Sequence, residues 1–138
     1  MSELISFQRE TDLGVDEFHD LLVRSTLGDR RPLSDPNRLQ GMLENADILV
    51  SARTQNQRLV GIARSITDYS FCTYLSDLAV DAEYQKQGIG KELIRQTRLA
   101  SGLDVRLILL SAPQAVDYYP HIGFEKHDSC WTISPEAK

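Results

Sequence analysis

The chain has 138 residues with a formal net charge of −5 at pH 7, and 41% of its residues are hydrophobic. This length is typical of one domain with a single core, and the acidic balance argues against a nucleic-acid-binding protein, which usually carries a basic stripe. No apolar run approaches the roughly 20 residues that cross a bilayer, and the N-terminus lacks the features of a signal peptide. We therefore expect one domain over residues 1–138, located in the cytoplasm, with neither a nucleic-acid nor a membrane partner.

The first half of the chain predicts a strand, two helices and a hairpin. A weakly alternating stretch at 4–8 indicates an opening strand, and residues 15–24 show the three-and-four spacing of an amphipathic helix. A second, short helix is predicted after Asp35, a capping residue that is followed by proline at the first helical position. Residues 48–52 and 59–63 predict two strands joined by a polar turn.

The second half predicts alternating strands and helices. The expected order is strand 72–80, helix 88–101 with Gly102 at its C-terminal cap, buried strand 105–110, helix 114–121, and a final strand from Phe124 that includes residues 131–133. This order predicts a mixed α/β domain.

The most informative stretch is residues 78–91, in which a strand leads into a loop with Gly88 and Gly90 at the first turn of a helix. A helix N-terminus presents unpaired N–H groups and the positive end of the helix dipole, which together suit an anion such as pyrophosphate. Glycines let ligand oxygens approach the backbone closely because no Cβ intervenes. The stretch therefore predicts a phosphate-binding turn.

Two other phosphate-binding loops fit this stretch poorly. A dinucleotide-binding loop needs glycine or alanine where Leu93 stands, and a P-loop needs serine or threonine where Glu92 stands. The glycine positions alone also leave open a purely structural role, in which Gly88 and Gly90 only cap and pack the helix.

Two motifs resemble a known family. The sequence Gln-Lys-Gln-Gly-Ile-Gly at 85–90 resembles the Q/R-x-x-G-x-G/A signature of the GNAT N-acetyltransferase superfamily, and residues 115–124 resemble the family's A-x-x-[FY]-Y-x-x-x-G-F ending. Both lie in the family's order, and the matched elements run from 72 to 131. The resemblance implies an α/β, GNAT-like fold: a mixed, mostly antiparallel sheet with splayed central strands and about four helices around it.

The resemblance also implies how the cosubstrate acetyl-CoA would bind. In the family, acyl-CoA lies between the splayed strands and its pantetheine arm pairs with the first of them, which implies a role for the backbone of Leu78, Ala79 and Val80. An N–H group near Leu78 and Ala79 would polarise the thioester carbonyl. The pyrophosphate would lie on the amides of the turn, with two lysines beside it; the implied residues are Gln85, Lys86, Gln87, Gly88, Ile89, Gly90 and Lys91.

Acetyl transfer to an amine needs two proton movements, since the amine must lose a proton and the departing thiolate must gain one. Tyr119 stands at the family's general-acid position, with a packing role as the alternative. Tyr118 is expected in the core, because the family often has phenylalanine there. Asp77 is a candidate base, acting directly or through water, with a structural hydrogen-bonding role as its alternative. His121 is expected to be solvated.

The two cysteines, Cys72 and Cys130, lie far apart and lack the spacing of metal ligands, so we expect no metal site. No motif links either of them to a histidine. Direct transfer in a ternary complex is therefore preferred to a cysteine acyl-enzyme. The sequence leaves open whether the two cysteines are free or paired.

The acceptor is expected to meet the cosubstrate beside the first two helices, where Arg30 and Arg31 form an adjacent cationic pair. They could bind an acidic group of the substrate, or lie solvated or ion-paired on the surface. A cationic amine would instead be attracted by the acidic balance of the chain, and the sequence does not choose between these acceptors.

The sequence as a whole predicts an enzyme, an acetyl-CoA-dependent N-acetyltransferase. It would act on a primary amine of a small molecule or on an amino group. A non-catalytic acyl-CoA-binding module and a protein-interaction domain on the same scaffold are the alternatives. A homodimer that pairs or exchanges its C-terminal strand is also considered.

Overall fold

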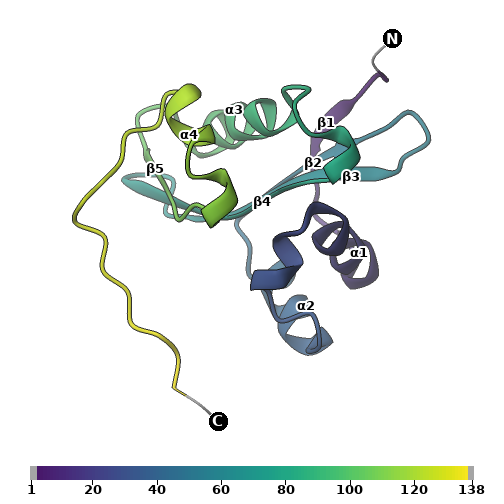
Figure 1. Cartoon of the computed structure of the whole chain (residues 1–138), viewed down its shortest axis with the longest axis horizontal. Helices are drawn as coiled ribbons and strands as arrows, with labels where there is room; N and C mark the ends of the chain where they lie inside the picture. The colour runs from purple at the N-terminus through teal and green to yellow at the C-terminus, as the bar shows by residue number, and fades with distance from the viewer. Residues whose placement is uncertain (1–2, 137–138) are drawn as a thin grey trace.

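The computed structural model describes residues 3–136, which form one five-stranded sheet in the order β1-β2-β3-β4-β5 (Figure 1). The strands are β1 (Ser6–Arg9), β2 (Ile48–Arg53), β3 (Leu59–Thr67), β4 (Cys72–Val80) and β5 (Arg106–Leu109). Strands β1 to β4 pair antiparallel in chain order, and β5 pairs parallel with β4. The sheet is therefore mixed and mostly antiparallel, as predicted.

Helices cover both faces of this sheet. They are α1 (Val15–Ser25), α2 (Pro36–Glu44), α3 (Ile89–Ser101) and α4 (Tyr118–His121), with single turns η1 (Leu27–Arg30), η2 (Ala82–Tyr84) and η3 (Pro113–Ala115). Helices α1 and α2 lie on one face and α3 lies on the other (Figure 1). Within residues 3–136, no helix is both long and apolar enough to cross a membrane.

Alternation along β2 explains why the protein has two core layers. Ile48 and Val50 belong to the buried cluster around α3, whereas Leu49 between them belongs to the cluster around α1 and α2. Successive side chains of a strand point to opposite faces, so one strand supplies both layers. The sheet thus separates an α1/α2 face from an α3 face.

Local sequence signals set the helix ends as predicted. The carboxylate of Asp35 accepts a hydrogen bond from the Arg38 backbone N–H at 3.1 Å, and Pro36 is the first residue of α2. Helix α3 ends at Gly102, whose φ of +117° favours glycine.

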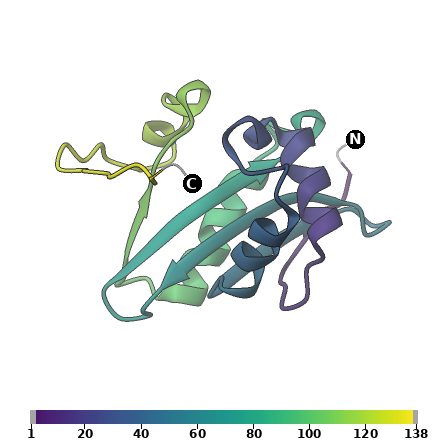
Figure 2. The ribbon, with the colours of Figure 1, turned by 90° about the horizontal axis from the view of Figure 1, so that it is seen from below.

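Strands β4 and β5 separate partway along their length. Their pairing runs from Cys72 opposite Arg106 to Leu75 opposite Leu109, after which β5 ends and β4 continues to Val80. Residues 76–80 therefore have β3 on one side, and no strand of residues 3–136 pairs with them on the other. We call the opening between residues 76–80 and the segment after β5 the wedge; Figure 2 shows the two strands diverging. The predicted splay is confirmed.

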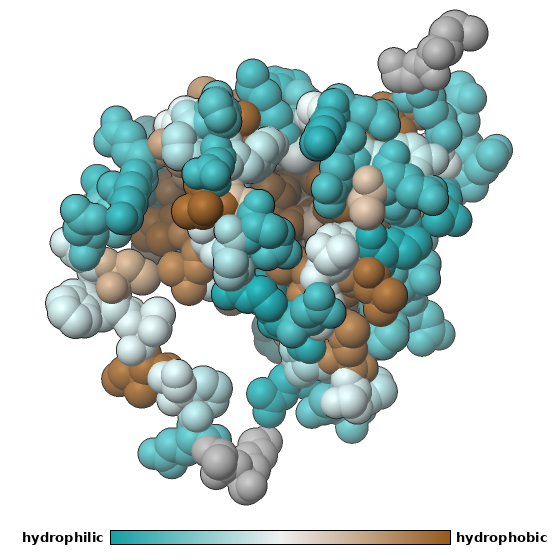
Figure 3. Space-filling view, in the orientation of Figure 1, coloured by the Kyte–Doolittle hydropathy of each residue, from teal (hydrophilic) through white to brown (hydrophobic). Residues whose placement is uncertain are grey.

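The prediction of a final strand is wrong for the described residues. Residues 124–136 form no strand, and Trp131 and Ile133 are 91% and 98% exposed. An alternating pattern shows that a segment can pair, but it does not show that a partner edge lies within reach. The segment extends away from the body of the molecule, and apolar surface is visible around β5 and α4 (Figure 3).

Two smaller predictions also need correction. Strand 105–110 was expected to be buried, but β5 is an edge strand in which Ile108 is 44% exposed. The helix expected over 114–121 is divided into η3 and the short α4. Cys72 and Cys130 are both free, which settles the question that the sequence left open.

Candidate active site

The turn before α3 leaves backbone donors without partners. Lys86 and Gly88 have φ values of +64° and +83°, and the chain then enters α3 with no side chain capping its N-terminus. The first hydrogen bond of the helix runs from the Glu92 N–H to the Gly88 carbonyl oxygen at 3.1 Å. Among the described residues, the N–H groups of residues 87–91 find no protein acceptor. Such a set of free donors is an anion-binding arrangement.

The space in front of Gly88 is open. A Cβ placed on this glycine would meet no atom within 4 Å. The side chains of Lys86 and Lys91 are exposed on either side of the turn, whereas the guanidinium of Arg95, one turn further along α3, pairs with Glu92 at 2.9 Å. The two lysines therefore add positive charge to the turn that holds the free amides.

Gly90 lies against an aromatic side chain from α4. A Cβ placed on Gly90 would lie 3.0 Å from the Tyr118 hydroxyl oxygen and 3.9 Å from the Leu78 Cδ2 atom. A Cβ at this distance would be a tight contact, so a larger residue at Gly90 would require the phenol to shift. Strand β4, the start of α3 and α4 thus meet at one point beside the wedge.

The two adjacent tyrosines of α4 lie in different surroundings. Tyr119 packs against the α3 core cluster, and its ring centroid lies 5.4 Å from that of Phe124 in an edge-to-face contact. Tyr118 is 37% exposed. Neighbouring helix positions point about 100° apart, and Tyr119 shares its side of α4 with the partly buried Ile122. The expectation that Tyr118 belongs to the core is therefore wrong.

Both tyrosines are suited to keeping their protons at neutral pH. Burial raises the pKa of the Tyr119 hydroxyl above its ordinary value, and the neighbouring Tyr118 raises it further. Burial also raises the pKa of Tyr118. A phenol that stays neutral is a proton donor, so either side chain has the chemistry of a general acid.

One edge of β4 is open along the predicted pantetheine-binding residues. Leu78, Ala79 and Val80 pair with β3 on one side, and β5 does not reach them on the other. The Gln85 side chain covers the far end of this edge by donating from Nε2 to the Val80 carbonyl oxygen at 3.1 Å. The remaining edge has the form that an extended chain of amide groups can join.

Asp77 lies next to the wedge, but its carboxylate is already engaged. Its side chain is fully buried; Oδ1 accepts a hydrogen bond from Arg31 Nε at 2.6 Å, and Oδ2 accepts one from Arg64 Nε. The same arginines bind the Ser76 carbonyl oxygen at 2.8 Å and the Ser76 hydroxyl at 2.9 Å. A base must reach the amine that it deprotonates. This geometry corresponds to the structural alternative for Asp77 and argues against the base.

The predicted pair Arg30 and Arg31 is divided between two roles. The Arg31 guanidinium binds Asp77 and Ser76 of β4. It is therefore not available to bind an acidic group of a substrate. Arg30 is exposed and extends toward the segment after β5, with its Nη1 atom 3.5 Å from the Ser111 carbonyl oxygen. The two residues therefore span the wedge on the side of η1.

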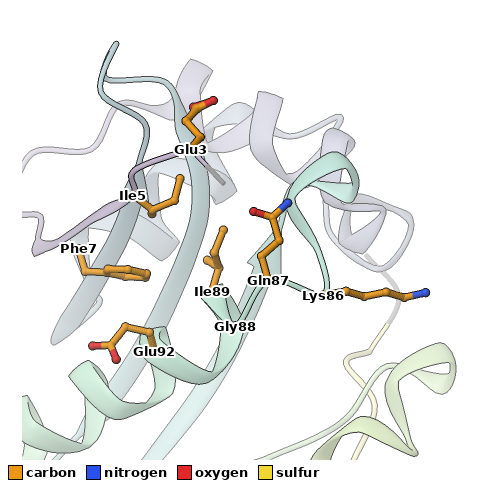
Figure 4. Close-up of a pocket in the computed structure, with 8 residues that line it drawn as sticks. All are labelled: Glu3, Ile5, Phe7, Lys86, Gln87, Gly88, Ile89 and Glu92. Atoms are coloured by element: carbon orange, nitrogen blue, oxygen red, sulfur yellow. The ribbon is translucent and has the colours of Figure 1, made fainter. Parts of the chain in front are cut away.

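A cavity of about 550 Å³ lies on the other side of the glycine turn, between the start of β1 and the start of α3 (Figure 4). Its lining residues are Glu3, Ile5, Phe7, Lys86, Gln87, Gly88, Ile89 and Glu92. None of them comes from β4, β5 or α4, but Lys86, Gln87, Gly88 and Ile89 belong to the turn that is predicted to bind pyrophosphate. At the wedge, the Tyr118 side chain lies over Gly90, so the tyrosine fills the space in front of this glycine.

Residues 31–131 match the family model described as the acetyltransferase (GNAT) domain. Over 75 residues the chain is 40% identical to GCN5-related N-acetyltransferase 2, chloroplastic, of Arabidopsis thaliana. This alignment covers 53% of this chain and 29% of that protein. Over 108 residues it is 36% identical to Histone acetyltransferase TAP1 of Glycine max. This second alignment covers 70% of this chain and 46% of that protein. The chain thus spans less than half the length of these two curated relatives.

Solved structures share the fold over nearly the whole chain. A GNAT family acetyltransferase of Streptococcus pneumoniae TIGR4 matches with a TM-score of 0.75 at 20% identity, covering 98% of this chain and all of that one (100%). An aminoglycoside N-acetyltransferase, AAC(6')-Iy in complex with CoA, matches with a TM-score of 0.71 at 14% identity, covering 99% and 98% of the two chains. At these identities the likeness shows a common fold.

Proposed function

Because the chain belongs to the GNAT acetyltransferase family, we propose that it transfers the acetyl group of acetyl-CoA to a primary amine of a small molecule or to an amino group. Transfer occurs by direct attack in a ternary complex. One observation carries the proposal: the open edge of β4, the glycine turn before α3 and Tyr118 of α4 meet beside the wedge.

The residues present fit the cosubstrate. The free N–H groups of residues 87–91 and the open space at Gly88 suit a pyrophosphate, and Lys86 and Lys91 add positive charge. The unpaired edge at residues 78–80 suits the amides of the pantetheine arm. CoA is present in one solved structure that shares this fold, which supports the same ligand class here.

The chemistry follows from these placements. The neutral amine attacks the thioester carbonyl and forms a C–N bond, while negative charge develops on the carbonyl oxygen. A backbone N–H on the open edge near Leu78 and Ala79 would stabilise that charge. The C–S bond then breaks, the nitrogen releases its extra proton to water, and the thiolate takes a proton from a tyrosine of α4, which is reprotonated from water. Tyr119 is the candidate from the family motif. We assign no side chain as the base, since both oxygens of Asp77 bind arginines.

Two measurements test the proposal. Calorimetry with acetyl-CoA should show binding, and a thiol-release assay over a panel of primary amines should show acceptor-dependent turnover. Binding without thiol release for any amine would favour the non-catalytic acyl-CoA-binding module. No detectable binding of acetyl-CoA would remove the enzyme and favour a protein-interaction domain on the same scaffold.

A further inference from the structure

Positive charge is left over on the η1 side of the wedge. Arg31 and Arg64 both bind Asp77, and the described part of the chain pairs no second carboxylate with either of them. The Asp77 side chain is fully buried, and those of Arg31 and Arg64 are 19% and 7% exposed. Two cations thus share one anion in a poorly solvated place, where uncompensated charge is costly.

Arg30 adds a second positive charge next to this group. In residues 3–136 it pairs with no carboxylate, and its contact with the Ser111 carbonyl oxygen is long, at 3.5 Å. A guanidinium has five N–H donors in a planar fork, which matches carboxylate and phosphate groups. Arg30 therefore has donors to offer to a ligand at the wedge.

Arg30 places its positive charge on the side of the wedge from which the acceptor would approach. Turn η1 lies with α1 and α2 on one face of the sheet, whereas the glycine turn belongs to α3 on the other face (Figure 1). A thioester held on the β4 edge would have the glycine turn on the α3 side, which leaves the η1 side for the incoming amine. An anionic group on that amine would then lie within the region that Arg30 spans between η1 and Ser111.

We propose that the acceptor carries an anionic group, a carboxylate or a phosphate, close to its reacting amine, and that Arg30 binds this group. Arg31 is a positioning residue that fixes η1 to β4 through Asp77. The inference rests on the proposed function and narrows its acceptor class. It also chooses between the two acceptor types that the sequence left open, because it selects the anionic one over a purely cationic amine.

Matched acceptor pairs test the proposal. Amino acids are compared with their primary amides, and ethanolamine phosphate is compared with ethanolamine. The wild-type protein should prefer the anionic member of a pair by about 10-fold or more in kcat/KM, since hydrogen bonds to charged groups contribute about 10- to 100-fold to an equilibrium constant. The pair with the larger ratio identifies the anion as a carboxylate or a phosphate.

The variant Arg30→Ala should raise KM for the anionic acceptors by about 10- to 100-fold and leave the neutral acceptors and the affinity for acetyl-CoA unchanged. Arg30→Lys keeps the charge but not the fork, so it should restore part of the preference. Arg38→Ala is the matched control, because Arg38 is an exposed arginine of α2 that pairs with Asp35, the N-cap residue of the same helix. It should leave every acceptor unchanged.

The outcomes separate this proposal from the proposed function. If the wild-type protein acetylates neutral amines as well as anionic ones, or if Arg30→Ala lowers kcat/KM equally for both members of a pair, the anionic acceptor is wrong while the acetyltransferase stands. If acetyl-CoA does not bind, or if it binds and no acceptor of the panel is acetylated, both proposals fail.

Discussion

Gly88 and Gly90 are required for different reasons although they lie two residues apart. At Gly88 the backbone has a φ of +83°, and the place of a side chain is open space. Gly90 lies inside α3, where a side chain would press on the Tyr118 hydroxyl. The positive φ thus favours glycine at position 88, where the proposed phosphate would also approach, whereas glycine at position 90 avoids a tight contact with the phenol.

Replacing Gly88 by valine should weaken the binding of acetyl-CoA by at least about 10-fold, because the side chain enters the space in front of the free amides and removes charge-assisted hydrogen bonds. The strained φ should also lower the free energy of unfolding by about 1–3 kcal/mol. Calorimetry and urea unfolding measure the two effects. Gly41→Val, at an open position of α2, is the control, and an unchanged affinity in Gly88→Val would contradict the phosphate-binding turn.

The two tyrosines of α4 form a matched pair for a test of the general acid. Tyr119→Phe keeps the ring but removes the proton donor, and should lower kcat by roughly 100-fold with little change in the affinity for acetyl-CoA. Tyr118→Phe removes the hydroxyl that lies at Gly90 and should retain most of kcat. If the loss of kcat followed Tyr118 instead, the proton donor would be the tyrosine that faces the glycine turn.

The raised pKa of Tyr119 predicts a stability effect at alkaline pH. Burial holds this pKa above the ordinary value of about 10, so the folded state binds the proton more tightly than the unfolded state does. Its contribution to stability is therefore complete below about pH 10 and is lost as the pH rises further. Thermal unfolding between about pH 9 and 11 should show a smaller alkaline loss in Tyr119→Phe than in the wild type, and equal losses would show that the phenol ionises freely.

At the scale of elements, the sequence predicts what local signals determine. The start of α2 follows from Asp35 and Pro36, the end of α3 from Gly102, and strands β2 to β4 from apolar runs bounded by polar turns. The glycine turn was predicted because its spacing and its place between a strand and a helix are visible in the sequence. These features depend on residues that are close together in the sequence, which explains why they could be predicted from the sequence alone.

Features that depend on distant residues were not predicted. Nothing in the sequence pairs Arg31 with Asp77 across 46 positions, although Arg64 and Asp77, charged residues inside apolar strands, could have suggested a buried ion pair. Two adjacent tyrosines can exchange surroundings through a rotation of one short helix, so the choice between Tyr118 and Tyr119 needed the packing of α4. The apolar residue Ile122, three positions after Tyr119, was the available signal.

The Arg31–Asp77–Arg64 cluster joins η1, β3 and β4, and its removal should loosen all three. Asp77→Asn keeps the size of the side chain but leaves two poorly solvated guanidinium groups without an anion, so the free energy of unfolding should fall by about 3–5 kcal/mol. Asp29→Asn, at an exposed position of η1, should leave stability unchanged. A variant Asp77→Asn with wild-type stability and a strongly reduced kcat would restore Asp77 as the base.

The whole molecule leaves apolar surface uncovered near its C-terminal end. Ile108 and Leu110, in and after β5, are 44% and 49% exposed, and Trp131 has no packing partner within the described residues. Isolated exposed apolar residues are ordinary, but a group of them beside an unpaired strand edge marks a surface suited to association.

The single tryptophan of the chain reports on this surface. At low protein concentration, the Trp131 fluorescence should be quenched by acrylamide as efficiently as that of a free indole, because the side chain is 91% exposed. Removing residues 130–138 should change the free energy of unfolding by less than about 0.5 kcal/mol. A shielded tryptophan, or a large loss of stability on truncation, would show that the segment packs against β5 of its own or a second chain.

The glycine turn and η1 belong to opposite faces of the sheet, so the proposed function does not require the two substrates to share an entrance. In the proposed complex, backbone groups bind the donor from the α3 side, and most substitutions leave such groups intact, whereas side chains of the short connection between α1 and α2 bind the acceptor. In such a protein, a few substitutions in this connection can change the acceptor while the acetyl donor stays the same. Grafting residues 26–35 from a relative with another preference is therefore a direct route to exchanging acceptors.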